Sequence, residues 1–417
     1  MWYAWLEAQH KLLKMLGGWP VPPDDASRPN PCATATPAAR GSSWLTGAIG
    51  PISDPPPFDI SSVRIGESDV PVIEQVIDST PFCALRKFIR APVPTSPTSP
   101  MAAAGPANGL EPMEIFVCAP LAGHHAVMLC ETVETLLQCG NVCITDWTNA
   151  RDVPLADGPF ALDDYVLTIE RFLQSAGAAR LHVLAVCQAT GPALAATALR
   201  ASAGEATPLS LTLMGGPIDA RLNPTTIDRF ARSHSIDWFR NTVIDIVPPP
   251  YRGAGRRVYP GFIQHAAIVA SHPERQWAVQ SRYWESQWSG DPQAIALSLH
   301  RLREYTAVLD MAEAYFLDMI RVFFHETLLA RGTWHVGARA VRPQDLVAPA
   351  LCTVEGNRDT ITGAGQTHVA HTLCSGIRET ARRRMTIADC DHYGLFTGPR
   401  WCELIYPALV EFWQTFQ

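Results

Sequence analysis

The sequence has no long apolar run, no CxxC pair and no excess of basic residues; its nearest cysteine pair, Cys139 and Cys143, lacks a second ligand pair at the usual spacing for zinc. No stretch of about 18 apolar residues occurs, so a transmembrane helix is not expected. Lysine and arginine number 33 against 40 aspartates and glutamates, and the formal net charge of -7 argues against a nucleic-acid partner. With 47% hydrophobic residues, the 417-residue chain can form a large core with an insertion, or two domains.

The eleven cysteines are scattered and contain no CxxC pair. This usage is typical of reduced, buried thiols, so we expect no disulfide framework, no structural zinc and no resident cofactor. Residues 1–19 carry Glu7, His10, Lys11 and Lys14 where a secretory signal would be apolar. We therefore expect a cytoplasmic protein.

Proline and small residues dominate the N-terminal region, residues 1–110. Residues 2–16 have the spacing of an amphipathic helix. Pro-rich segments at 20–57 and 91–110 flank a short folded piece that ends near Phe88. This region is predicted to hold a helix, Pro-rich segments and a linker to the main fold.

From residue 111 onward, short apolar runs alternate with helical patterns, which predicts an α/β protein. Its central sheet should be mostly parallel and covered by helices on both faces. Over residues 221–344, helical and aromatic stretches replace the strands, and we interpret this segment as a helical cap insertion. The core would then comprise residues 111–220 and 345–417. The strand candidates are residues 113–119, 142–145, 181–186, 209–214, 350–354 and 385–388.

Cys187 follows one of these buried strand candidates and precedes an Ala-rich helical pattern. A nucleophile on a tight strand-to-helix turn, as in the α/β-hydrolase fold, needs small residues two positions before and after it. Ala185 and Ala189 occupy these positions, where glycines are usual. A lone cysteine after an apolar strand is more often a buried core residue, so the assignment depends on partners elsewhere in the chain.

A nucleophilic thiol needs a base, and the base needs an orienting carboxylate. In this fold the chain order is nucleophile, acid, histidine. Asp359 follows strand candidate 350–354 and His392 follows the next, so they are the predicted acid and base. Alone, each would be an ordinary loop residue. The rival acids Asp389 and Asp391 lie too near His392 in sequence to reach its far ring nitrogen easily.

Backbone N–H groups must also stabilise the oxyanion of the tetrahedral intermediate. The predicted donors are Gln188, next to the nucleophile, and Ala122 and Gly123 in the loop after the first core strand. Glycine at position 123 would allow close approach of the backbone. His124 is predicted to cover the mouth of the site, and no metal is expected there.

Around these residues the sequence resembles the intracellular poly(3-hydroxybutyrate) depolymerases, a polyhydroxyalkanoate depolymerase family with the α/β-hydrolase fold. The resemblance implies a Cys-Asp-His triad at Cys187, Asp359 and His392. It also implies cleavage of storage polyester and association with polyester granules in the cytoplasm. The matching stretches include MWYAWLEAQHKLL, PFCALRKF, APLAGHHAVML, ITDWTNARDVPLADGPFALDDY, HVLAVCQ, LMGGPIDARLNPT, VYPGFIQ, TVEGNRDTITGAGQT and DHYGLFTGPRW.

The chain departs from the family pattern without losing a triad residue. Ala122 replaces a usual serine, Ala189 a usual proline, Thr360 a common second aspartate and Asp391 a usual glycine. These changes bear on rate and substrate preference. A negative charge at Asp391 would also raise the pKa of His392.

Three other functions stay open at this stage. A polyhydroxyalkanoate synthase-like acyltransferase would use a related triad, although synthases typically carry Gly-x-Cys-x-Gly and this chain has Ala185 and Ala189. A general esterase or thioesterase and a catalytically impaired granule-binding protein are the others. The sequence also leaves open whether water or coenzyme A accepts the acyl group, which monomer length is preferred, and the oligomeric state.

Overall fold

The computed structural model describes residues 55–92, 112–271 and 273–417. The helix predicted over residues 2–16 and nearly all of both Pro-rich segments lie outside these ranges. Within the described ranges, none of the helices has both the length and the apolarity that crossing a membrane requires.

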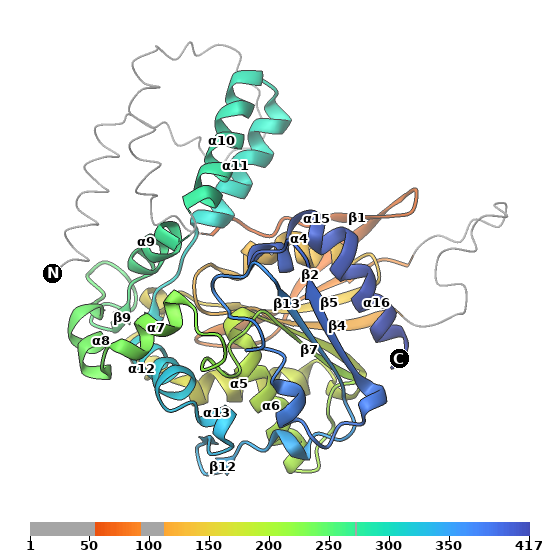
Figure 1. The fold of residues 1–417 in the computed structure, drawn as a ribbon. Coiled ribbons are helices and arrows are strands. Elements are labelled where there is room, and N and C mark those ends of the chain that lie inside the picture. The colour runs from red at the N-terminus through yellow and green to blue at the C-terminus, as the bar shows by residue number, and fades with distance from the viewer. Residues whose placement is uncertain (1–54, 93–111, 272) are drawn as a thin grey trace.

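A nine-stranded sheet forms the centre of the molecule, in the order β1-β2-β3-β5-β4-β6-β7-β13-β14 (Figure 1). The strands from β5 to β14 are mutually parallel, whereas β1, β2 and β3 pair in antiparallel fashion. The mostly parallel sheet is confirmed. The strands are β1 (Ser62–Ile65), β2 (Ser68–Thr80), β3 (Cys83–Arg90), β4 (Met113–Cys118), β5 (Gly140–Trp147), β6 (Leu181–Val186), β7 (Ser210–Met214), β13 (Ala350–Gly356) and β14 (Arg382–Ile387).

The short folded piece before Phe88 forms β1, β2 and β3 and extends the sheet beyond β5. Most side chains of β2 are exposed or only half-buried, so this strand has no continuous apolar run. At the opposite edge β14 begins with three arginines, Arg382 to Arg384, and only its last part has the pattern of a buried strand. Edge strands tolerate such polar sequences because one side of the strand faces solvent.

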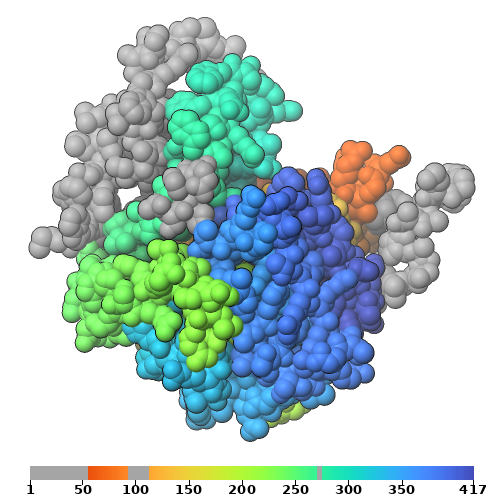
Figure 2. Space-filling model, viewed as in Figure 1, coloured from red at the N-terminus to blue at the C-terminus, as the bar shows by residue number. Residues whose placement is uncertain are grey.

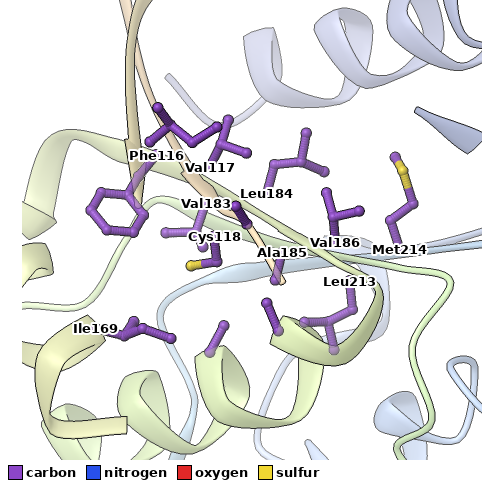
Figure 3. Packing of buried hydrophobic residues seen from close by; sticks show 14 of the residues in the cluster. Phe116, Val117, Cys118, Ile169, Val183, Leu184, Ala185, Val186, Leu213 and Met214 are labelled. Atoms are coloured by element: carbon purple, nitrogen blue, oxygen red, sulfur yellow. The ribbon is translucent and has the colours of Figure 1, made fainter. Parts of the chain in front are cut away.

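Helices cover both faces of the sheet (Figure 1). On one face α5 (Leu162–Ser175) packs against α6 (Thr190–Ser202). On the other face lie α4 (Cys130–Leu136) and α16 (Tyr406–Gln414). The Trp413 indole of α16 donates a hydrogen bond to the Thr212 hydroxyl of β7. Figure 3 shows apolar side chains of β4, β6 and β7 packed with Ile169 of α5. The inner strands are buried on both faces, which explains their continuous apolar runs.

Between β7 and β13 the chain is mainly helical, as the sequence predicts, with two small sheets, one of order β10-β9-β8 and one formed by β11 and β12. Two of its helices, α10 and α11, pack side by side and project from the body of the molecule (Figures 1 and 2). The elements are α7 (Thr226–Ser233), α8 (Ile236–Thr242), β8 (Asp245–Ile246), β9 (Arg257–Tyr259), α9 (Gly261–Ser271), α10 (Pro273–Ser289), α11 (Pro292–Thr306), β10 (Met311–Ala312), α12 (Glu313–Met319), α13 (Leu328–Arg331), β11 (His335–Val336) and β12 (Arg339–Ala340). After β13 come α14 (Ala370–Leu373) and α15 (Gly398–Arg400).

Candidate active site

Cys187 lies directly after β6, at the start of a short 3-10 helix (Cys187–Ala189) that leads into α6. Its φ of 54° lies in the left-handed region, which costs a non-glycine residue of order 1 kcal/mol or more. Ala185 and Ala189 are fully buried, so small side chains are required there, as the sequence predicts. The backbone strain of this turn falls on Cys187 itself, because Ala189 has an ordinary φ of -70°.

Neighbouring residues hold this turn in place. The Thr190 hydroxyl donates a 2.9 Å hydrogen bond to the Cys187 carbonyl oxygen. Gly216, just after β7, lies so close that an added Cβ would overlap both that oxygen and the Thr190 hydroxyl. The absence of a side chain at position 216 therefore allows the turn to approach the neighbouring strand end.

Asp359 and His392 meet at the ends of β13 and β14. The His392 Nδ1 lies 2.8 Å from Asp359 Oδ2, and both side chains are almost fully buried. The other Asp359 oxygen accepts the N–H groups of Ile361 and Thr362, at 2.8 and 2.9 Å. These bonds fix the carboxylate and orient the imidazole, whose remaining nitrogen is left for its hydrogen bond with Cys187. The structure thus brings together Cys187, Asp359 and His392.

The pKa of His392 reflects opposing effects. Burial lowers the pKa, but the negative charges of Asp359 and Cys187 and the hydrogen bonds to both outweigh it, and the pKa lies well above its usual value. The imidazolium form of the ring is therefore favoured, which suits His392 to accept a proton.

The two rival acids have other partners. Asp389 forms a 2.6 Å ion pair with Arg358, and Asp391 Oδ1 accepts the Gly394 N–H at 2.7 Å. The expectation that Asp391 raises the pKa of His392 finds no support, because the principal causes are Asp359 and Cys187. Asp391 instead supports the turn that follows His392.

The predicted oxyanion loop contacts Gln188 through its side chain. The Ala122 N–H donates to Gln188 Oε1 at 2.9 Å, and the Tyr315 hydroxyl of α12 donates to the same oxygen at 2.6 Å. Gly123 has a φ of 93°, which requires glycine, and its carbonyl oxygen lies 3.4 Å from Gln264 Nε2. No sequence pattern points to this contact of Tyr315, because Tyr315 lies 127 positions from Gln188 within the helical insertion.

His124 is buried beneath the insertion rather than open to solvent. It forms an antiparallel bridge with Val308, and its Nε2 lies 3.3 Å from the Tyr393 hydroxyl. Burial, with the positive charges of His265 and Arg275, lowers the pKa of His124 to about 3. A histidine that is neutral at physiological pH and packed against Tyr393 is placed to support the neighbour of His392.

The strand order and the strained turn after β6 define the protein as an α/β-hydrolase. In this fold the nucleophile follows the strand at the centre of the sheet, and the acid and histidine follow later strands. Cys187, Asp359 and His392 have these positions after β6, β13 and β14.

Residues 215–417 match the family model described as PHB de-polymerase C-terminus. This match covers just under half of the chain and shows its similarity to that family, and the protein is an ester hydrolase. The family resemblance predicted from the sequence is confirmed. The matched region contains Asp359 and His392, whereas Cys187 precedes it.

Several solved structures align with most of the chain at low sequence identity. A hypothetical protein from Pseudomonas aeruginosa is 9% identical, with a TM-score of 0.43 over 88% of this chain and 97% of that chain. A 2-hydroxy-6-oxo-6-phenylhexa-2,4-dienoate hydrolase from a Rhodococcus strain is 13% identical, with a TM-score of 0.42 over 83% and 99% of the two chains. A haloalkane dehalogenase from Bradyrhizobium elkani is 11% identical, with a TM-score of 0.42 over 84% and 99%. No curated protein matches the sequence.

Proposed function

We propose that this hydrolase cleaves the ester bonds of a poly(3-hydroxybutyrate)-type polyhydroxyalkanoate through an acyl-cysteine intermediate. The observation that carries the proposal is the position of His392, which is held by Asp359 at 2.8 Å and hydrogen-bonded to Cys187 on a strained turn. The family of residues 215–417 supplies the substrate class.

In the first half of the reaction, His392 takes the proton of Cys187, and the thiolate sulfur bonds to the ester carbonyl carbon. The tetrahedral intermediate then breaks its carbon–oxygen bond, and His392 returns the proton to the departing alkoxide. The products of this step are a shortened hydroxyl-ended chain and an acyl-cysteine.

In the second half, His392 takes a proton from water, and the resulting hydroxide attacks the thioester carbonyl. The carbon–sulfur bond breaks, the acid is released and the thiol is restored. Coenzyme A would enter in the same way through its thiol and yield a hydroxyacyl thioester. Water is the acceptor in the proposed reaction, and the experiment below distinguishes the two.

The structure refines which N–H groups would hold the oxyanion. Because the Ala122 N–H donates to the side chain of Gln188, the proposed donors are the backbone N–H groups of Gln188 and Gly123. Ala122 would instead fix the loop from which Gly123 donates. The change from a usual serine to alanine at position 122 leaves this backbone bond intact.

Exposed tryptophans on the projecting helix pair suit an insoluble apolar substrate. Trp277 and Trp288 of α10 are 72% and 81% exposed, and Leu297 of α11 is 57% exposed. The two tryptophans are eleven residues apart, which places them on one face of a helix with 3.6 residues per turn. Aromatic side chains exposed in this way commonly mark contact with an apolar surface. We assign this face of α10 to the polyester granule surface in the cytoplasm.

Product analysis on amorphous polyester granules tests the proposal, with and without coenzyme A. Wild-type protein should release hydroxyacids or short oligomers, Cys187→Ala should release none, and Cys139→Ser should match wild type because Cys139 lies outside the site. Formation of hydroxyacyl thioesters in the presence of coenzyme A would show that coenzyme A, rather than water, accepts the acyl group.

Four results would overturn the proposal. Full activity of Cys187→Ala would remove the acyl-cysteine. Polymer formation from a hydroxyacyl-coenzyme A would indicate a synthase, and turnover of soluble short esters with none on granules would indicate a general esterase. Granule binding without any turnover by the wild type would indicate a granule-binding protein.

A further inference from the structure

A cysteine, a histidine and a glutamate meet where the projecting helix pair joins the core. Cys130 is the first residue of α4, and His300 and Glu304 lie one turn apart on α11. One ligand atom from each lies within 4.8 Å of the other two. We propose that Cys130, His300 and Glu304 form a zinc site that ties α11 to α4.

The distances suit a tetrahedral zinc ion. His300 Nε2 lies 3.2 Å from Glu304 Oε1. Two ligands bound to zinc at about 2.0–2.1 Å with tetrahedral angles lie roughly 3.3 Å apart. The Cys130 sulfur needs to close by roughly 1 Å to reach a zinc–sulfur bond of about 2.3 Å. A side-chain rotation provides a shift of this size.

The charge around the cluster also favours a cation. Glu131 and Glu134 place negative charge close to Glu304, and Arg301 opposes them. A divalent cation would offset carboxylate charge that is partly removed from water.

The ligand types select the metal. A thiolate with an imidazole suits zinc, whereas magnesium and calcium prefer sites made of oxygen ligands alone. Three protein ligands leave a fourth position for water or for Glu134. The expectation of no zinc rested on cysteine spacing along the chain, and that spacing could not reveal ligands from α4 and α11.

Such a site would connect the arm that carries Trp277 and Trp288 to the core. Cys130 Sγ donates a 3.4 Å hydrogen bond to the Phe58 carbonyl oxygen, and His300 pairs with Glu304. Zinc would replace these weak contacts by coordinate bonds and stabilise the folded chain by mass action.

Metal binding by the full-length protein tests this inference. After dialysis against chelator, the protein is titrated with zinc and, separately, with cobalt, whose thiolate complexes absorb light. We expect one zinc per chain, a cobalt–thiolate absorption band and a higher Tm with zinc. Cys130→Ser should abolish the band, and His300→Ala and Glu304→Gln should each weaken binding at least tenfold. Cys139→Ser, in the turn after α4, and His335→Ala, on an exposed strand, should bind as wild type.

Two results would overturn the site. One is a wild-type protein that binds less than about a tenth of an equivalent of zinc at micromolar concentration. The other is binding that survives Cys130→Ser with an unchanged cobalt spectrum. Far-ultraviolet circular dichroism of each variant checks that it is folded. If Cys130→Ser does not fold, His300→Ala becomes the deciding variant, because His300 is partly exposed on α11. Hydrolysis by the proposed triad is measured separately, so a loss of hydrolysis and a lack of zinc binding can be distinguished.

Discussion

The Tyr315 hydroxyl lies 2.6 Å from Gln188 Oε1, the same oxygen that accepts the Ala122 N–H. One amide oxygen thus joins the helical insertion, the turn that carries Cys187 and the proposed oxyanion loop. Tyr315 is fully buried, so its hydroxyl has little access to water as an alternative partner. The insertion therefore takes part in positioning the proposed oxyanion loop.

Tyr315→Phe should lower kcat about tenfold, equivalent to about 1.4 kcal/mol, with a smaller effect on KM. The change removes one hydrogen bond to Gln188 while keeping the ring, so the oxyanion loop loses support in the transition state. Steady-state kinetics on a soluble hydroxyacid ester measure the effect. Tyr259→Phe changes a half-buried tyrosine of β9 that stacks on Phe316; it is the control and should leave kcat unchanged. Equal losses in both variants would indicate a general packing effect.

Asp359→Asn should reduce kcat by about 10²–10⁴-fold while the protein stays folded, because an amide cannot hold the imidazole in the productive tautomer or stabilise the imidazolium. The matched variant Asp391→Asn should stay within about tenfold of wild type, since Asp391 Oδ1 accepts a backbone N–H and an amide oxygen can do the same. If Asp391→Asn lowered kcat more than Asp359→Asn, Asp391 rather than Asp359 would be the acid of the triad.

The sequence predicts the parallel part of the sheet well because its strands are buried on both faces and appear as short apolar runs. It predicts the order Cys187, Asp359, His392 because these residues follow β6, β13 and the short apolar end of β14. It does not reveal β2 as part of the sheet, since that strand is largely exposed. The contacts of Gln188 with Tyr315 and of Cys130 with His300 depend on how the insertion folds back, and no local pattern encodes them.

Replacing Trp277 and Trp288 by alanine should lower the rate on granules several-fold and leave the rate on soluble esters unchanged. Both side chains are more than two-thirds exposed, so their loss removes contact area with an apolar surface without opening the core. Granule sedimentation and product release measure binding and turnover. Val347→Ser, which changes an exposed apolar side chain outside the insertion, is the control. Equal granule binding by the double variant and wild type would exclude this face as the contact.

His124 should make the protein less stable in acid. Its pKa of about 3 in the folded protein lies below the value near 6.5 of an unfolded histidine, so between these values the unfolded chain binds more protons. Stability is then lost as the pH falls from about 6.5 toward 3, by up to about 1.4 kcal/mol per pH unit from this residue. Urea unfolding of wild type and His124→Gln from pH 7 to pH 4 should show a shallower loss in the variant. The control His335→Gln, at an exposed histidine, should keep the wild-type slope of unfolding free energy against pH. An unchanged slope in His124→Gln would show that His124 is protonated in the folded protein.

Gly216→Ala should disrupt the nucleophile turn directly. An added Cβ would overlap the Cys187 carbonyl oxygen and the Thr190 hydroxyl, so either β7 or the turn must shift. Forcing extra atoms into a packed region costs typically about 1–3 kcal/mol, and we expect a Tm lower than wild type together with a loss of kcat of at least tenfold. Thr190→Val, which removes the hydroxyl bond to Cys187 but keeps the volume, separates the two causes and should lower kcat less. If Gly216→Ala kept both Tm and kcat, the close approach of the two strand ends would not be needed to hold Cys187 in its left-handed conformation.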